Sequence, residues 1–134
     1  MNPVPAGPSI LICDDEAPIR HVVRMRLEAA GYRVVEARTG VEGLEAATAS
    51  PPVLVITDYQ MPLMSGVEMA KRLCDNPETV DVPVVLVTAR GYVLQPAELL
   101  GTSIRAVLGK PFGMRQLLEH VARLLPGSDA RKVA

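Results

Sequence analysis

The sequence predicts an α/β domain of the doubly wound type, in which helices cover both faces of a five-stranded parallel sheet. Two observations predict it: five short apolar runs rich in valine and isoleucine, and segments of helical periodicity between them. Parallel strands need crossover connections, and these segments are long enough to be helices. A chain of 134 residues is large enough for one such domain with one sizeable core.

The five apolar runs are the expected strands. They lie at residues 9–13, 33–36, 53–57, 82–87 and 106–108. The runs at 53–57 and 82–87 are apolar on both faces, which is typical of strands buried in a parallel sheet.

Helical periodicity, with apolar residues three and four positions apart, separates most of the runs. The first helix is expected to end at Gly31, because glycine is a common residue just beyond a helix C-terminus. Two further helices are expected to begin with a capping box, formed by Thr39 with Glu42 and by Ser65 with Glu68.

A single domain is expected over residues 9–125, with flexible tails at 1–8 and 126–134. The first tail is rich in proline, and the second is polar without periodicity. The second is also too short to form an attached output domain. Glycine and proline interrupt residues 91–104, so the fourth helix is expected to be short or irregular.

Composition argues against several classes of partner. The chain carries 14 Lys and Arg against 15 Asp and Glu, so it lacks the basic field of a nucleic-acid or anionic-membrane binder. Its apolar runs are far shorter than the roughly 18 residues of a membrane helix, and residues 1–8 do not resemble a secretory signal. Two cysteines, Cys13 and Cys74, do not form a disulfide framework. We therefore expect a cytoplasmic protein.

Polar side chains follow four of the five expected strands. Asp14 and Asp15 follow the first strand, Asp58 follows the third, Thr88 ends the fourth, and Lys110 follows the fifth. In the strand order 2-1-3-4-5 these four strands are neighbours, so their carboxyl ends meet at one edge of the sheet. Open α/β sheets bind their ligands at this edge.

The residue types at this edge predict a site for a metal ion and a phosphoryl group. Three neighbouring carboxylates repel one another, so a cation is expected among them. Oxygen ligands favour Mg²⁺, or Mn²⁺ in its place, over zinc. A metal and Lys110 together neutralise phosphoryl oxygens. Asp58 is then the expected nucleophile, forming an aspartyl-phosphate, and Thr88 is expected to donate its hydroxyl to a phosphoryl oxygen.

Each of these side chains also has a structural interpretation when it is taken singly. Asp14 or Asp15 suits the cap of the helix that follows the first strand, and Asp58 suits a turn. Thr88 and Lys110 suit ordinary structural or solvated positions. Their joint placement at one edge of the sheet favours the functional interpretation.

Four motifs together resemble the receiver domain of two-component response regulators. They are LICDDEAPIR at 11–20, ITDYQMP at 56–62 followed by Ser65 and Gly66, VTA at 87–89 and GKPF at 109–112. The resemblance covers residues 9–125, and it implies the flavodoxin-like (βα)5 fold. Within that family, the chain resembles the single-domain chemotaxis regulators.

The resemblance implies a role for each acidic residue. Asp58 accepts the phosphoryl group from a histidine of a sensor histidine kinase or of a histidine phosphotransfer protein. Asp14 and Asp15 position Mg²⁺ together with Asp58, and the backbone carbonyl of Gln60 is a further ligand.

The resemblance also implies roles for residues on the last two strands. Thr88 and Lys110 sense and bind the phosphoryl group, and the Lys110–Pro111 bond is expected to be cis, which X–Pro bonds reach at modest cost. Val107 departs from the family, because many members carry tyrosine or phenylalanine there.

The chain is therefore expected to be a phosphorylation-controlled signalling module and not an enzyme, acting through an unknown downstream protein. Two alternatives remain. A phosphorylation-independent scaffold would not need the intact acidic set. An aspartate-nucleophile phosphohydrolase places its nucleophile in an Asp-x-Asp motif after the first strand, whereas the first two acids here are adjacent.

Overall fold

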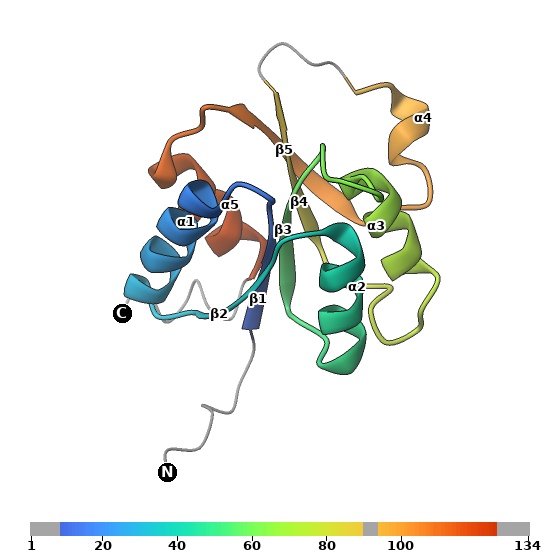
Figure 1. The fold of residues 1–134 in the computed structure, drawn as a ribbon, viewed down its shortest axis with the longest axis horizontal. Coiled ribbons are helices and arrows are strands. Elements are labelled where there is room, and N and C mark those ends of the chain that lie inside the picture. Colours follow the sequence, from blue (N-terminus) through green and yellow to red (C-terminus); the bar gives the residue numbers. More distant parts are fainter. Residues whose placement is uncertain (1–8, 90–93, 126–134) are drawn as a thin grey trace.

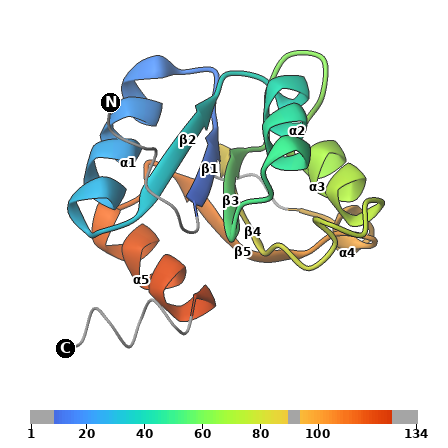
Figure 2. The ribbon, with the colours of Figure 1, turned by 90° about the horizontal axis from the view of Figure 1, so that it is seen from below.

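The computed structural model describes residues 9–89 and 94–125, which form a central sheet between two layers of helices (Figures 1 and 2). Strands and helices alternate along the chain. The tails expected at 1–8 and 126–134 lie outside the described residues, as do positions 90–93 at the start of the fourth helical segment. Within the described ranges, none of the helices has the length and apolarity that crossing a membrane requires.

All five expected strands are present, and they pair in parallel in the order β2-β1-β3-β4-β5. They are β1 (Ser9–Cys13), β2 (Arg33–Ala37), β3 (Leu54–Asp58), β4 (Val84–Ala89) and β5 (Ile104–Lys110). The predicted fold class is confirmed. β5 extends beyond the apolar run at 106–108, because this edge strand alternates exposed with partly buried side chains.

Four helices connect the strands, and a fifth follows the last strand within the residues that the structure describes. They are α1 (Ala17–Ala29), α2 (Gly40–Ala49), α3 (Gly66–Cys74), α4 (Pro96–Leu99) and α5 (Met114–Leu124). As predicted, α1 ends just before Gly31, whose φ of 100° is one that glycine adopts readily.

The two predicted capping boxes are half formed. The hydroxyls of Thr39 and Ser65 accept hydrogen bonds from the backbone N–H groups three residues later, at 3.0 and 3.1 Å. The carboxylate of Glu42 instead accepts from the backbone N–H of Arg38. Glu68 pairs with Arg72 one turn further along α3. The N-caps were therefore predictable, whereas the glutamates found other partners.

The sheet separates two hydrophobic clusters. Side chains alternate along β1, so that Ile10 and Ile12 pack toward α1 and α5 while Leu11 and Cys13 pack toward α2 and α3. The four helices with buried side chains thus cover the two faces of the sheet in pairs, as Figures 1 and 2 show. This packing fixes the strands and therefore the positions of the residues at their carboxyl ends.

α4 differs from the other helices. It is a single turn from Pro96 to Leu99 with no buried residue, and both views place it beside α3. Gly101, with a φ of 74°, follows it. The expectation of a short fourth helix is confirmed.

Candidate functional site

The predicted site residues lie at the carboxyl ends of neighbouring strands. Asp58 is the last residue of β3, Lys110 is the last residue of β5, and Asp14 follows β1 directly. Thr88 is buried near the end of β4, where it pairs in register with Gly109 of β5. The strand order thus brings these positions to one edge, as the sequence predicted.

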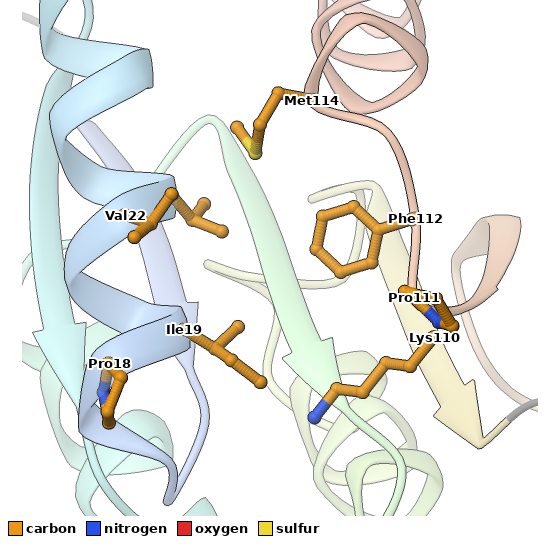
Figure 3. Close-up of a pocket in the computed structure, with 8 residues that line it drawn as sticks. Pro18, Ile19, Val22, Lys110, Pro111, Phe112 and Met114 are labelled. Atoms are coloured by element: carbon orange, nitrogen blue, oxygen red, sulfur yellow. The ribbon is translucent and has the colours of Figure 1, made fainter.

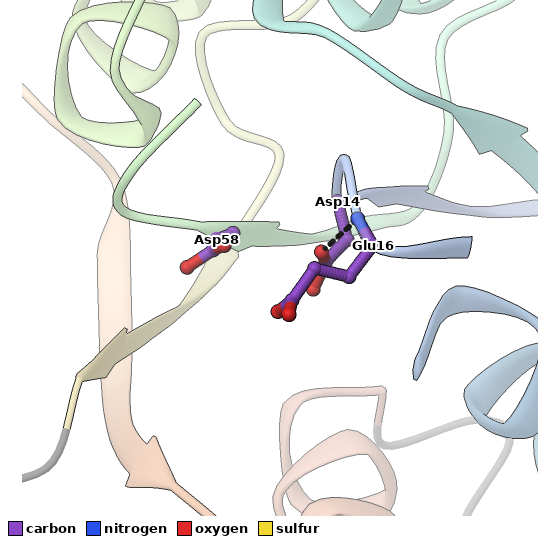
Figure 4. Close-up of side chains that lie close together, drawn as sticks. All are labelled: Asp14, Glu16 and Asp58. Atoms are coloured by element: carbon purple, nitrogen blue, oxygen red, sulfur yellow. Dashed lines mark hydrogen bonds between the residues drawn. The ribbon is translucent and has the colours of Figure 1, made fainter. Parts of the chain in front are cut away.

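An acidic cluster occupies this edge. One carboxylate oxygen of each of Asp14, Glu16 and Asp58 lies within 4.8 Å of the others, and Figure 4 shows the three side chains turned toward the same space. Asp14 and Asp58 are 5% and 8% exposed, whereas Glu16 is exposed. The backbone N–H of Glu16 donates to Asp14 Oδ1 over 2.8 Å, which orients that carboxylate.

Lys110 faces all three carboxylates. Its Nζ lies 2.8 Å from Glu16 Oε1, 3.2 Å from Asp58 Oδ2 and 3.4 Å from Asp14 Oδ2. Partial burial disfavours the charged amine, but the hydrogen bond to Glu16 and the attraction of Asp14 and Asp58 outweigh it, so the pKa of Lys110 is raised. One positive charge therefore faces three negative ones. The Lys110–Pro111 bond is cis, as expected.

The carboxylate of Asp58 has opposing neighbours. Burial raises its pKa, and the negative charge of Asp14 adds to this effect. The charge and hydrogen bond of Lys110, and a hydrogen bond from the backbone of Gln60, act in the opposite direction. The net result is a raised pKa, because Lys110 and Gln60 do not fully offset the effects of burial and of the Asp14 charge.

An open pocket of about 370 Å³ exposes this edge to ligands, and it is lined by Asp15, Glu16, Asp58, Gln60, Ala89 and Lys110. Asp15 is exposed and lies outside the acidic cluster, although it lines the same pocket. Gln60 is likewise exposed at the rim. Asp14, Glu16, Asp58 and Lys110 thus form the centre of the site, with Asp15 and Gln60 at its border.

Glu16 is the member of this cluster that sequence reasoning missed. The signal was present, since Glu16 is the third acidic residue in a row after β1. What assigns it to the cluster is Lys110, 94 positions away in the chain. Only the fold reveals that contact.

The backbone around Asp58 is tightly held. The N–H of Tyr59 donates to the carbonyl of Val87 over 2.7 Å, and its carbonyl accepts from the N–H of Gly66 over 2.9 Å. A Cβ on Gly66 would lie 2.3 Å from the Asp58 carbonyl oxygen. A side chain at position 66 would therefore displace the end of β3.

A larger groove lies beside the acidic pocket. It encloses about 530 Å³ between α1 and the segment that joins β5 to α5, and Ile19, Val22, Phe112 and Met114 are among the residues that line it (Figure 3). Lys110 borders both spaces. The groove is otherwise apolar, so the ionic chemistry belongs to the smaller pocket.

Cys13 does not contribute a nucleophile to the site. Its Sγ is buried against the sulfur of Met69. Burial, together with the charges of Glu42 and Asp14, raises the pKa of Cys13 to about 12. The thiolate is therefore scarce at neutral pH.

Comparison with known proteins gives a consistent result. Residues 10–122 match the model of the response regulator receiver domain family. Among curated proteins, the phosphate regulon transcriptional regulatory protein PhoB of Pseudomonas aeruginosa is 35% identical over 119 residues, which cover 89% of this chain and 52% of that protein. Hybrid signal transduction histidine kinase D of Dictyostelium discoideum is 31% identical over 93% of this chain and 8% of its own length.

The crystal structure of the chemotaxis protein CheY4 of Vibrio cholerae superposes with a TM-score of 0.81 at 29% identity, covering 89% of this chain and 99% of that one. The chain spans about half the length of the transcriptional regulators that it matches. The match over residues 10–122, together with the fold and the acidic pocket, shows that the chain belongs to the response regulator receiver domain family of two-component signalling systems.

Proposed function

We propose that the chain accepts a phosphoryl group on Asp58 and changes its protein partners in response. The observation that carries this proposal is the position of the Asp58 carboxylate. It lies at the end of β3, in an open pocket, 3.2 Å from Lys110 Nζ and beside two further carboxylates. A carboxylate so placed is both accessible and oriented, as a nucleophile must be.

The charges of the pocket fit a divalent cation. Three carboxylates within 4.8 Å face one lysine, so negative charge remains to be neutralised. Asp14, Asp58, the neighbouring Asp15 and the backbone carbonyl of Gln60 would hold Mg²⁺, or Mn²⁺ in its place, since all four offer oxygen. When bound, the ion supplies neutralisation of charge on the phosphoryl oxygens.

The proposed step is transfer from a phosphohistidine to Asp58. An Oδ atom of Asp58 attacks phosphorus, an O–P bond forms, the P–N bond breaks, and its electron pair goes to the imidazole nitrogen. Lys110 exchanges its contacts with the carboxylates for a phosphoryl oxygen. Thr88, near the end of β4, donates its hydroxyl to another phosphoryl oxygen.

The donor in this proposal is a sensor histidine kinase or a histidine phosphotransfer protein. The apolar groove beside Lys110 supports docking of such a protein, because a partner seated there would hold its histidine next to the acidic pocket. The output is a downstream protein that distinguishes the two states of Asp58. Two free thiols, Cys13 and Cys74, support a reducing cytoplasm as the compartment.

Intact mass after treatment with acetyl phosphate and Mg²⁺ tests the proposal without knowledge of the kinase. The wild-type protein should gain about 80 Da, the mass of one phosphoryl group, and Asp58→Asn should gain nothing. Asp81→Asn is the matched control, because Asp81 is an exposed acid that precedes β4 at the opposite end of the sheet. It should gain the same mass as the wild type.

Three results would reject the proposal. A folded wild-type protein that gains no mass would exclude a competent acceptor site, and a gain on Asp58→Asn would move the acceptor to another residue. Release of phosphate from p-nitrophenyl phosphate over many turnovers would show a hydrolase and not a signalling domain.

A further inference from the structure

Arg20 is the only buried basic side chain among the residues that the structure describes. It lies on the first turn of α1 and is 7% exposed. A buried guanidinium needs both a counter-charge and hydrogen-bond acceptors, since its desolvation is otherwise unfavourable. The groups that Arg20 contacts therefore indicate its structural role.

The guanidinium of Arg20 joins β2 to the loop that carries the first acids of the site. Its Nε donates to Glu36 Oε1 over 2.6 Å, and its Nη1 donates to the backbone carbonyl of Asp14 over 2.7 Å. Glu36 supplies the counter-charge from β2. The second contact of Arg20 is with a neutral backbone carbonyl, so it fixes the position of the Asp14 backbone and does not neutralise a charge.

Three of the four polar atoms of Asp14 are held by hydrogen bonds from or to neighbouring segments. Its N–H donates to the carbonyl of Ala37 over 3.1 Å, its carbonyl accepts from Arg20, and its Oδ1 accepts from the N–H of Glu16. Only Oδ2 is left to face the pocket, 3.4 Å from Lys110 Nζ. The carbonyl that accepts from Arg20 belongs to the peptide directly after Asp14. Arg20 therefore fixes the backbone on the far side of Asp14 from β1, while the N–H bond to Ala37 fixes the near side, and the two together orient the carboxylate.

We propose that Arg20 is a positioning residue, which fixes the Asp14 carboxylate so that it can act as a ligand for Mg²⁺. This inference rests on the proposed function, in which Asp14 holds the ion. Groups that hydrogen-bond to the ligands of a metal orient them, and removing such a group typically lowers metal affinity by about 10- to 100-fold. A loosely held Asp14 would have to become ordered each time the ion binds.

Arg24 provides a control that distinguishes positioning of Asp14 by Arg20 from general attachment of α1 to β2. It lies one turn further along α1, and its Nη1 donates to Glu36 Oε2 over 2.7 Å. Its hydrogen bonds in the structure go to the carboxylates of Glu28 and Glu36, whereas the bond to the Asp14 carbonyl comes from Arg20. Arg24→Met therefore weakens the same link between helix and strand and leaves the contact with Asp14 in place.

The test is a calorimetric titration with Mg²⁺ on the wild type, Arg20→Met and Arg24→Met. Arg20→Met should bind Mg²⁺ about tenfold or more weakly than the wild type, and Arg24→Met should stay within about twofold. Equal affinity of wild type and Arg20→Met would overturn the proposal. So would a loss in Arg24→Met as large as that in Arg20→Met, because the effect would then come from general packing of α1.

If Arg20→Met does not fold, Arg20→Lys carries the same test. Lysine keeps the charge but lacks the planar fork that reaches Glu36 and Asp14 together. Its affinity for Mg²⁺ should also be lower than that of the wild type, by a smaller factor. Wild-type affinity in Arg20→Lys, when Arg20→Met is unfolded, would mean that Arg20 serves only as a counter-charge and would overturn the proposal.

A second measurement in metal-free protein keeps this inference distinct from the proposed function. The Glu16 amide is protected by its bond to Asp14 Oδ1, so loosening Asp14 should speed hydrogen exchange at Glu16. We expect about a tenfold increase in Arg20→Met, or a smaller one in Arg20→Lys, and none in Arg24→Met. A wild type that binds no Mg²⁺ would reject the metal site, whereas unchanged exchange at Glu16 would reject the role of Arg20.

Discussion

The hydroxyl of Tyr59 donates to Glu98 Oε1 over 2.6 Å and thereby joins the residue after Asp58 to α4, 39 positions further along the chain. The other oxygen of Glu98 accepts from the backbone N–H of Gln95 at the start of α4. A single carboxylate therefore holds both the first turn of α4 and the ring next to the proposed acceptor. This contact is notable because β5 carries Val107 where many receiver domains carry an aromatic residue.

Removing the hydroxyl should loosen α4 without unfolding the domain. In Tyr59→Phe we expect hydrogen exchange at the amides of Glu98 and Leu100 to become several-fold faster. The loss in global stability should be roughly 0.5 to 1.5 kcal/mol or less, the usual contribution of one hydrogen bond. Exchange measured by NMR and urea denaturation check the two effects.

A double-mutant cycle with Glu98→Gln assigns the effect to this bond. Tyr59→Phe should accelerate exchange less in the Glu98→Gln background than in the wild type, because the contact is already weakened there. Equal acceleration in both backgrounds would show that the ring acts through other neighbours.

The crowded carboxylates make a second prediction. Without metal, Asp58→Asn should raise the melting temperature by roughly 2 to 6 °C, which corresponds to about 1 kcal/mol in a domain of this size. Burial and Asp14 disfavour the ionised Asp58 more than Lys110 favours it, so its pKa is raised and the ionised form destabilises the fold at neutral pH. Thermal unfolding in EDTA measures the shift.

Magnesium should have the opposite dependence on Asp58. About 10 mM Mg²⁺ should raise the melting temperature of the wild type by mass action, and it should raise that of Asp58→Asn much less. Asp81→Asn, remote from the pocket, should respond to Mg²⁺ as the wild type does. Melting temperatures that change neither with Mg²⁺ nor with Asp58→Asn would contradict a charged, metal-binding cluster.

Glu36 makes a third prediction, on pH. Burial disfavours its charge, but hydrogen bonds from Arg24 and Arg20 outweigh this, so its pKa lies below its ordinary value of 4.5. A lowered pKa stabilises the fold above the unfolded-state pKa, and this stabilisation is lost as the pH falls through the folded-state pKa.

Glu36→Gln should therefore cost roughly 1 to 3 kcal/mol at about pH 7, because it leaves the buried Arg20 without a counter-charge. Urea denaturation should show that the difference from wild type shrinks below a pH of about 4.5. Glu28→Gln, whose partner Arg24 is exposed, should show little difference at either pH. A pH-independent cost would mean that the side chain of Glu36 acts through packing.

A fourth prediction concerns Gly66, because its surroundings leave no room for a side chain. A Cβ there would meet the Asp58 carbonyl oxygen at 2.3 Å and Leu86 Cδ1 at 3.0 Å. We expect Gly66→Ala to lose roughly 1 to 3 kcal/mol and to be phosphorylated more slowly by acetyl phosphate, since the end of β3 must shift. Gly109→Ala places its Cβ in open space, so unchanged stability and rate are expected there.

Local patterns predicted most of the fold. The valine-rich run at 53–57 indicated a strand buried on both faces, and β3 has that burial. Ser65 and Thr39 marked the starts of helices because an N-cap is formed within three residues of the chain. Asp58 and Lys110 were placed correctly at one edge because parallel strands bring their carboxyl ends together.

Contacts between distant segments could not be predicted in this way. The place of Glu16 in the acidic cluster depends on Lys110, and the anchoring of α4 depends on Tyr59. The burial of Arg20 depends on Glu36 of β2, a strand whose polar end looked unremarkable. In each case the partner becomes a neighbour only through the order of the strands.

Among the residues described, α4 has no buried side chain, so it contributes little to the hydrophobic stabilisation of the domain. The four other helices hold the hydrophobic clusters and therefore set the free energy of unfolding. α4 is instead linked to the site by the partly buried hydrogen bond from Tyr59 to Glu98, and one such bond is worth about 1 kcal/mol. Under the proposed function, a phosphoryl group on Asp58 that competes with this bond would change the position of α4 and leave the free energy of unfolding almost unaltered.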